Sequence, residues 1–68
     1  MTVAITVNGE PHTAPPGSTL EQLVSGLTKL TSGVAAAVGG QVVPRGRWAA
    51  TALQDGDRIE IVTAVQGG

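Results

Sequence analysis

The chain opens with Thr2-Val3-Ala4-Ile5-Thr6-Val7-Asn8-Gly9, and this stretch predicts how its sheet begins. Val3, Ile5 and Val7 alternate with smaller or polar residues, a period of two that is typical of a strand with one buried face. Asn8-Gly9 follows, and both residue types tolerate the positive φ angles of a two-residue hairpin turn. The sequence therefore predicts an N-terminal β-hairpin.

The second strand of this hairpin is expected over residues 11–14, and Pro15-Pro16-Gly17 ends it. A helix is predicted to begin at Ser18-Thr19-Leu20-Glu21, which fits a capping box in which Ser18 and Glu21 each bond the other's backbone amide. One apolar face follows at helical spacing, formed by Leu20, Leu23, Val24 and Leu27. Lys29 is expected in the last turn and Gly33 at the helix end.

The next segment predicts two further strands. Val34-Ala35-Ala36-Ala37-Val38 is an unbroken apolar run bounded by glycines, which favours a central strand buried on both faces. Gly39-Gly40 predicts a turn, and Gln41-Val42-Val43 predicts a brief strand. Pro44 ends that strand because proline has no N–H group to donate to a ladder.

The rest of the chain predicts a compact turn and a last strand. Irregular apolar spacing over residues 45–53 favours a turn or a single helical turn that lays Trp48, the only aromatic residue, against the core. Asp55-Gly56-Asp57 is typical of a tight turn, which we prefer to a paired-carboxylate or metal site. Arg58–Thr63 is the predicted last strand, with its isoleucines facing inward.

The predicted element order is β-β-α-β-β-turn-β, which is the β-grasp layout. We expect an α+β fold in which a mixed sheet of about five strands carries one main helix on one face. The first and last strands are expected side by side and parallel at its centre. The predicted domain covers residues 1–64, and residues 65–68 form a flexible tail that ends in Gly-Gly.

Composition argues against several classes of function. The 68 residues carry a net charge of −1 with four basic side chains, so no basic stripe is available for nucleic acid. The absence of cysteine and the single histidine argue against disulfides, thiol chemistry and the usual zinc sites. No apolar run approaches the roughly 20 residues of a membrane span. We therefore expect a cytoplasmic protein that binds no metal, nucleic acid or membrane.

Several segments at this chain length together resemble one family. Val43-Pro44-Arg45 is followed by Trp48-Ala49, then by Gln54-Asp55-Gly56-Asp57, and finally by Gly67-Gly68. With the Asn8-Gly9 hairpin, these segments resemble the sulfur carrier proteins of thiamine biosynthesis, the ThiS family, which are ubiquitin-like. The resemblance covers the whole chain.

The resemblance implies a reaction cycle at the carboxylate of Gly68. An adenylating, E1-like activating enzyme would adenylate it with ATP, and a sulfur donor system such as a cysteine desulfurase would convert it to a thiocarboxylate. Thiazole synthase would then receive the sulfur. The chain itself would be a protein co-substrate that binds no cofactor, and not an enzyme. Relatives often carry a bulkier last strand than residues 62–65 as part of a partner-binding patch.

The residues agree with this chemistry. A terminal carboxylate is ionised at neutral pH and can attack the α-phosphorus of ATP. Val65, Gln66 and Gly67 would thread into partner active sites ahead of Gly68, because glycine lacks a Cβ and has wide φ/ψ freedom. Arg45 is a possible partner contact, and a solvated charge after a strand end is an equally good interpretation.

Three alternatives remain open at the level of sequence. The first is another sulfur carrier of the same fold, of the kind found as the small subunit of molybdopterin synthase. The second is a ubiquitin-like modifier attached to lysines, since it shares the Gly-Gly activation chemistry. The third is a β-grasp interaction module whose Gly67-Gly68 ending is accidental.

Overall fold

The N-terminal hairpin forms as predicted. In the computed structural model, which describes residues 2–28 and 33–63, strands β1 (Val3–Val7) and β2 (Glu10–Ala14) pair antiparallel. Asn8 and Gly9 connect them with φ angles of 52° and 83°, the left-handed conformation of a two-residue turn. A second hairpin joins β3 (Val34–Val38) to β4 (Gln41–Val43) through a glycine pair with φ angles of 60° and 86°.

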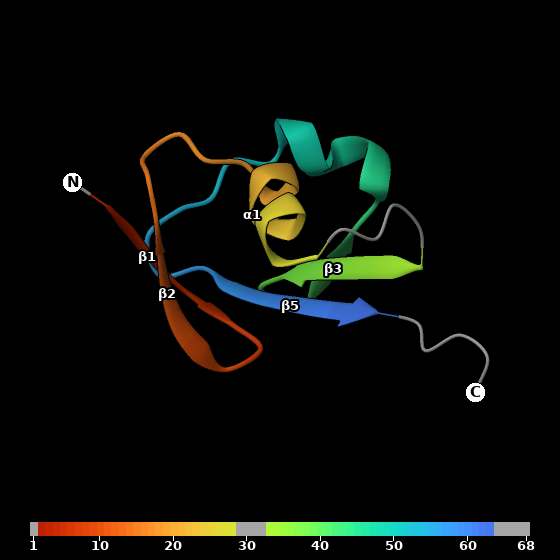
Figure 1. Cartoon of the computed structure of the whole chain (residues 1–68), viewed down its shortest axis with the longest axis horizontal. Coiled ribbons are helices and arrows are strands. Elements are labelled where there is room, and N and C mark those ends of the chain that lie inside the picture. The colour runs from red at the N-terminus through yellow and green to blue at the C-terminus, as the bar shows by residue number, and fades with distance from the viewer. Residues whose placement is uncertain (1, 29–32, 64–68) are drawn as a thin grey trace.

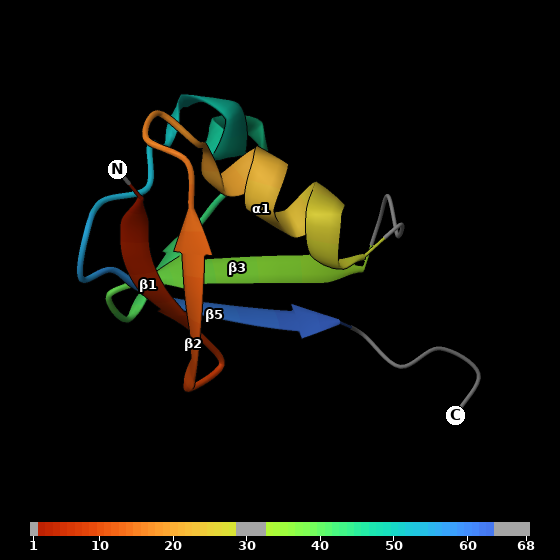
Figure 2. The ribbon, with the colours of Figure 1, turned by 60° about the vertical axis from the view of Figure 1, so that its left-hand side comes forward.

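The last strand, β5 (Arg58–Thr63), lies at the centre of the sheet, whose strand order is β2-β1-β5-β3-β4 (Figure 1). It runs parallel to β1 and antiparallel to β3, which confirms the predicted mixed sheet with its first and last strands adjacent. The predicted burial of β3 on both faces is wrong. Ala36 is buried but Ala35 is exposed, because the helical elements cover only one face of the sheet (Figure 2).

Helix α1 (Leu20–Leu27) begins one residue later than the predicted capping box requires. Its N-cap is Thr19, whose hydroxyl accepts from the Gln22 N–H at 3.3 Å, while the Gln22 side-chain oxygen accepts from the Thr19 N–H at 3.0 Å. Ser18 does not cap the helix because its hydroxyl donates to the Pro15 carbonyl at 2.7 Å. The prediction that Ser18 and Glu21 form the box is therefore wrong.

Thr19→Ala is expected to lower the free energy of unfolding by about 1 kcal/mol, because the Gln22 N–H loses its acceptor at the helix N-terminus. Glu21→Gln is the matched control at the position that does not take part in the box, and it should change stability by only a few tenths of a kcal/mol. Urea denaturation followed by circular dichroism measures both. An equal loss in the two variants would contradict the observed cap.

The buried face of α1 is narrower than predicted. Leu20 and Val24 are buried and Leu23 packs against the core, whereas the side chain of Leu27 is 47% exposed because it lies in the last turn. The helix ends at Leu27, earlier than the predicted end at Gly33, and the extended backbone of the next residue terminates it. The predicted position of Lys29 lies outside the described residues.

The predicted compact turn is a 3₁₀ helix, η1 (Arg45–Ala50), on the same side of the sheet as α1 (the teal segment in Figure 1). It carries Trp48 into the core, as predicted, where the ring is only 3% exposed and its Nε1–H donates to the Val43 carbonyl at 2.8 Å. The buried core comprises Ile5, Val7, Ala14, Leu20, Val24, Ala36, Trp48, Leu53 and Ile59.

The predicted turn at Asp55-Gly56-Asp57 also ties β1 to the segment that precedes β5. Asp55 accepts from the Ala4 N–H at 2.8 Å, and Gly56 donates its N–H to the Ala4 carbonyl at 2.7 Å. Asp57 closes the turn by accepting from the Gln54 N–H at 2.8 Å. Both carboxylates are thus bound to backbone amides, which confirms the turn. Within the described residues, no helix is both long and apolar enough to cross a membrane.

Candidate functional site

The four predicted tail residues, Val65, Gln66, Gly67 and Gly68, lie outside the described residues, as does the predicted domain boundary after residue 64. The structure instead describes the strand that leads to them. The end of β5 at Thr63 lies on the side of the sheet away from β1 and β2 (Figures 1 and 2). The site is therefore built on the central strand of the sheet.

The second half of β5 is held differently on its two sides. Every residue from Ile59 to Thr63 pairs with β3, but β1 pairs only with Arg58 and Ile59. Beyond that point, the Asn8 side chain continues the β1 ladder: its amide donates to the Ile61 carbonyl at 3.1 Å, and its oxygen accepts from the Ile61 N–H at 2.9 Å. The side chain of Asn8, a turn residue, thus holds the second half of β5, the strand that precedes the tail.

The uncovered face of the sheet carries an apolar patch beside this strand. Its two large side chains are Val42 and Val62, which are 74% and 64% exposed. Between them lies a shallow hollow of about 170 Å³, because the β3 residues below are alanines. We call this patch the outer face, formed by Ala35, Ala37, Val42, Glu60 and Val62.

Arg45 lies away from the outer face, on η1 and therefore on the helical side of the sheet. Its guanidinium carbon is 5.3 Å from the centroid of the buried Trp48 ring, a cation–π distance. Its side chain is exposed. The structure therefore does not bring Arg45 together with the residues around the end of β5, and any partner touching both must reach around the edge strand β4.

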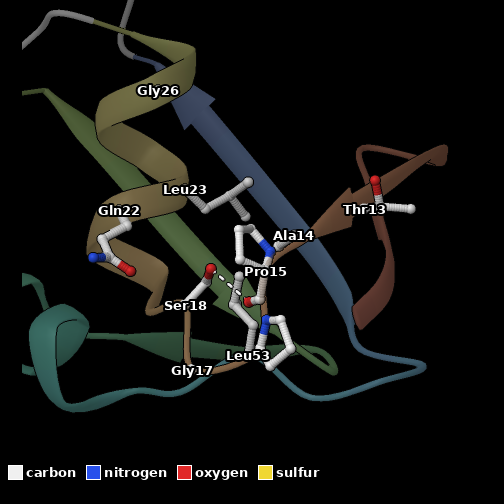
Figure 3. A pocket seen from close by; sticks show the side chains of 10 residues that line it. Thr13, Ala14, Pro15, Gly17, Ser18, Gln22, Leu23, Gly26 and Leu53 are labelled. Carbon is white, nitrogen blue, oxygen red and sulfur yellow. Dashed lines mark hydrogen bonds between the residues drawn. The ribbon is translucent and has the colours of Figure 1, made fainter. Parts of the chain in front are cut away.

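A groove beside α1 is lined by no charged side chain of the described part of the chain. It has a volume of about 530 Å³ and lies between α1, the end of β2 and the Pro15-Pro16-Gly17 loop (Figure 3). Ser18 lines it, but its hydroxyl already donates to the Pro15 carbonyl. Sequence reasoning missed this groove because its walls come from segments that meet only in the folded chain. Among the described residues, no three His, Cys, Asp or Glu side chains cluster as metal ligands would.

Comparison with known proteins identifies the family. The model of the ThiS family matches residues 5–68, a span that includes β5 and the Gly-Gly pair. The chain belongs to the ThiS family. It is 34% identical over 64 residues to the sulfur carrier protein ThiS of Escherichia coli, which covers 94% of this chain and 97% of that protein.

Two solved structures share the ThiS fold with this chain. The crystal structure of the thiamine biosynthesis protein ThiS from Geobacter metallireducens superposes with a TM-score of 0.77 at 31% identity, covering 97% of this chain and all of that one. A solution structure of a thiamine biosynthesis protein from the same organism gives a TM-score of 0.76 at 30% identity, covering 97% and 88% of the two chains. The predicted β-grasp fold is confirmed.

A further relative is much longer than this ThiS-family chain. The chain is 45% identical over 64 residues to a thiazole synthase of Magnetococcus marinus, and the match covers 94% of this chain. It spans only 20%, about a fifth, of that protein. One part of the thiazole synthase is thus similar to this whole domain.

The structure also explains the segments that carry the family resemblance. Val43 accepts the indole N–H of Trp48, and the 54–57 turn ties β1 to the loop before β5. Asn8 holds both the first hairpin turn and β5. These segments therefore stabilise the fold, and of the segments quoted for the family only the Gly67-Gly68 pair lies outside the described residues.

Proposed function

We propose that this ThiS-family protein carries sulfur for thiamine biosynthesis as a thiocarboxylate on Gly68, acting as a protein co-substrate in the cytoplasm. The family match over residues 5–68, which includes the Gly-Gly pair, carries this proposal. The similarity to the sulfur carrier of Escherichia coli over nearly the full length of both chains supports it.

The proposed cycle has three steps. A carboxylate oxygen of Gly68 attacks the α-phosphorus of ATP in an adenylating, E1-like partner, and pyrophosphate leaves. In the second step, the terminal sulfur of a persulfide on a donor system such as a cysteine desulfurase attacks the acyl carbon, and AMP leaves with the C–O bond electrons. A thiol reductant then attacks the donor-side sulfur of the acyl disulfide, which releases the thiocarboxylate and leaves a disulfide on the donor. The resulting thiocarboxylate delivers its sulfur to thiazole synthase. The carrier binds no cofactor of its own, because the partner supplies the ATP site.

In this proposal, the tail extends the Gly68 carboxylate from the folded domain into the partner's active site. Five residues follow Thr63, and a fully extended chain of that length spans at most about 18 Å. Gly67 and Gly68 present no Cβ to a narrow channel, with Val65 and Gln66 threading behind them. Ordering such a tail costs on the order of 1–2 kcal/mol per residue. Docking of the folded domain has to offset this cost.

We assign that docking to the outer face, which adjoins β5. Val42 and Val62 are large, exposed and separated by a hollow, so burying them against a partner removes apolar surface from water. Val62 lies in the last strand, where relatives often carry bulkier residues, so the apolar area available here is modest. Arg45, held over Trp48, would add a contact only with a partner that also reaches η1.

Val62→Asp is expected to weaken binding to the activating enzyme about tenfold while leaving the melting temperature nearly unchanged, because the side chain is mostly solvent-exposed. Ser25→Asp is the matched control, since it adds the same charge at an exposed position on α1. Isothermal titration calorimetry against the activating enzyme measures both. Equal affinity of the two variants for the activating enzyme would show that the outer face does not take part in docking.

The similarity to part of a thiazole synthase supports that enzyme as the recipient of the sulfur. The direct test supplies the thiocarboxylate form of the chain to thiazole synthase with its other substrates, and measures thiazole formation. We expect product only with the thiocarboxylate and none with the carboxylate form. If the thiocarboxylate accumulates but thiazole synthase does not consume it, the carrier serves another sulfur-transfer pathway.

A further inference from the structure

One edge of the sheet is formed by β4, which has only three residues. It follows β3 through a two-residue turn, so the pair Val38–Gln41 beside the turn is hydrogen-bonded and the next pair, Ala37–Val42, is not. Val42 therefore directs its backbone N–H and C=O away from β3, towards the open side of the sheet. Such an edge can accept an additional strand.

A groove runs along this edge between β4 and η1. Its volume is about 560 Å³. It is lined by the apolar residues Val38, Val42, Val43 and Pro44 and by the polar residues Gln41, Arg47 and Thr51. The Thr51 hydroxyl donates to the Arg47 carbonyl at 2.7 Å, so the backbone that carries Arg47 is held in place at the groove wall.

The charges beside the groove are all positive. Arg45 and Arg47 are both exposed on η1, and no acidic residue of the described chain lines the groove. Asp55 and Asp57 accept backbone N–H groups of other segments, and Glu60 belongs to the outer face. Arg45 is further oriented by the Trp48 ring beneath it. The groove thus combines an open strand edge, apolar walls and one cation, Arg47, with Arg45 exposed two residues away on η1.

We propose that the β4–η1 groove binds an extended, acidic segment of a partner protein. The segment would add to the sheet as a strand, exchanging backbone hydrogen bonds with Val42 and placing carboxylates near Arg47 and Arg45. Apolar side chains of the segment would rest on Val43 and Pro44. Nucleic acid fits this surface poorly, since two arginines on a chain of net charge −1 neutralise few phosphates. This surface shares Val42 with the outer face but otherwise has its own lining residues, and the proposal does not depend on the proposed sulfur chemistry.

The test titrates the ¹⁵N-labelled full chain with a synthetic peptide of alternating valine and glutamate, monitored by amide chemical shifts. We expect the shifts to concentrate at Val42, Val43 and Arg47, and binding to weaken as salt is added. The same peptide with lysine in place of glutamate should cause no such shifts. Arg47→Glu should weaken binding roughly fivefold or more, because an attraction becomes a repulsion.

Arg58→Glu is the matched control, since Arg58 is exposed on β5 outside the groove and undergoes the same charge reversal. It should bind the acidic peptide as the unmodified chain does. Absence of shifts at Val43 and Arg47, shifts confined to the outer-face residues of β3 and β5, or equal binding of the acidic and lysine peptides would overturn the proposal. So would equal weakening by the two reversals. The amide spectrum of each variant shows whether it is folded.

Discussion

Replacing Trp48 with alanine is expected to lower the free energy of unfolding by about 3–5 kcal/mol, the usual cost of emptying a core aromatic site. The ring is buried, it is the only aromatic side chain of the protein, and the rest of the core is aliphatic. A native domain has only about 5–15 kcal/mol of stability in total. The variant is therefore expected to be largely unfolded or close to it at 37 °C.

Trp48→Phe separates the ring from its hydrogen bond. Phenylalanine keeps much of the buried apolar area but cannot donate to the Val43 carbonyl, so a smaller loss of about 1–2 kcal/mol is expected. Urea denaturation followed by far-ultraviolet circular dichroism measures both variants without relying on tryptophan fluorescence. An unchanged midpoint for Trp48→Ala would show that the ring does not hold η1 against the core.

Deleting Gly68 is expected to abolish thiocarboxylate formation while shifting the melting temperature by no more than a few degrees. The new terminal carboxylate on Gly67 keeps its chemistry but ends about 3.5 Å short, and the attack on ATP requires reacting atoms within about 3–3.5 Å. Stability should persist because the described core lies between Ile5 and Ile59. Thiocarboxylate formation by the partner enzyme and thermal denaturation are measured on the same preparation.

The control for this deletion is a chain with one alanine added after Gly68, which carries the carboxylate too far and adds a Cβ at the tip. Both variants should retain their affinity for the activating enzyme within a few-fold, because the outer face is unchanged. Full conversion of the shortened chain to a thiocarboxylate would show that the length of the tail does not limit the reaction. A large loss of thermal stability would instead assign the terminal residue a role in folding.

The local parts of the fold could be predicted from the sequence. Asn8-Gly9 and Gly39-Gly40 specify their turns through the positive φ angles that these residues adopt at little cost. The capping box was predicted one residue early because two overlapping patterns satisfy the same rule, one beginning at Ser18 and one at Thr19. Contacts distant in sequence select the second: the Ser18 carbonyl accepts from Leu53, and Leu20 donates to Thr51.

The parallel pairing of β1 with β5 was predicted from the β-grasp element order, but other contacts between distant segments were beyond the sequence patterns. An apolar run such as Val34–Val38 predicts a strand but shows neither which of its faces is covered nor which strand is central, because both depend on pairing and packing across the whole chain. Asn8 was predicted only as a turn residue. Its side chain also bonds to Ile61, 53 positions away, and no periodicity indicates such a contact.

The candidate site likewise has one part that could be predicted from the sequence and two parts that could not. The tail chemistry was predicted from Gly67-Gly68 together with the family resemblance, and the family assignment is confirmed while the chemistry at Gly68 remains a proposal. The outer face and the β4–η1 groove were not predicted. Val42 and Val62 lie on one face of the sheet, on either side of the β3 alanines, only because β4 and β5 both pair with β3. Arg47 lines the groove only because η1 folds back beside β4.

The most direct test of sulfur carriage is intact mass spectrometry of the protein isolated from its native host, or prepared with its activating enzyme, ATP and a sulfur source. We predict a gain of about 16 Da that maps to Gly68, the mass change when sulfur replaces one carboxylate oxygen. Reproducible absence of that species, with the activating enzyme shown to be active, would contradict the account. It would direct attention to covalent conjugates of the chain or to a β-grasp module without tail chemistry.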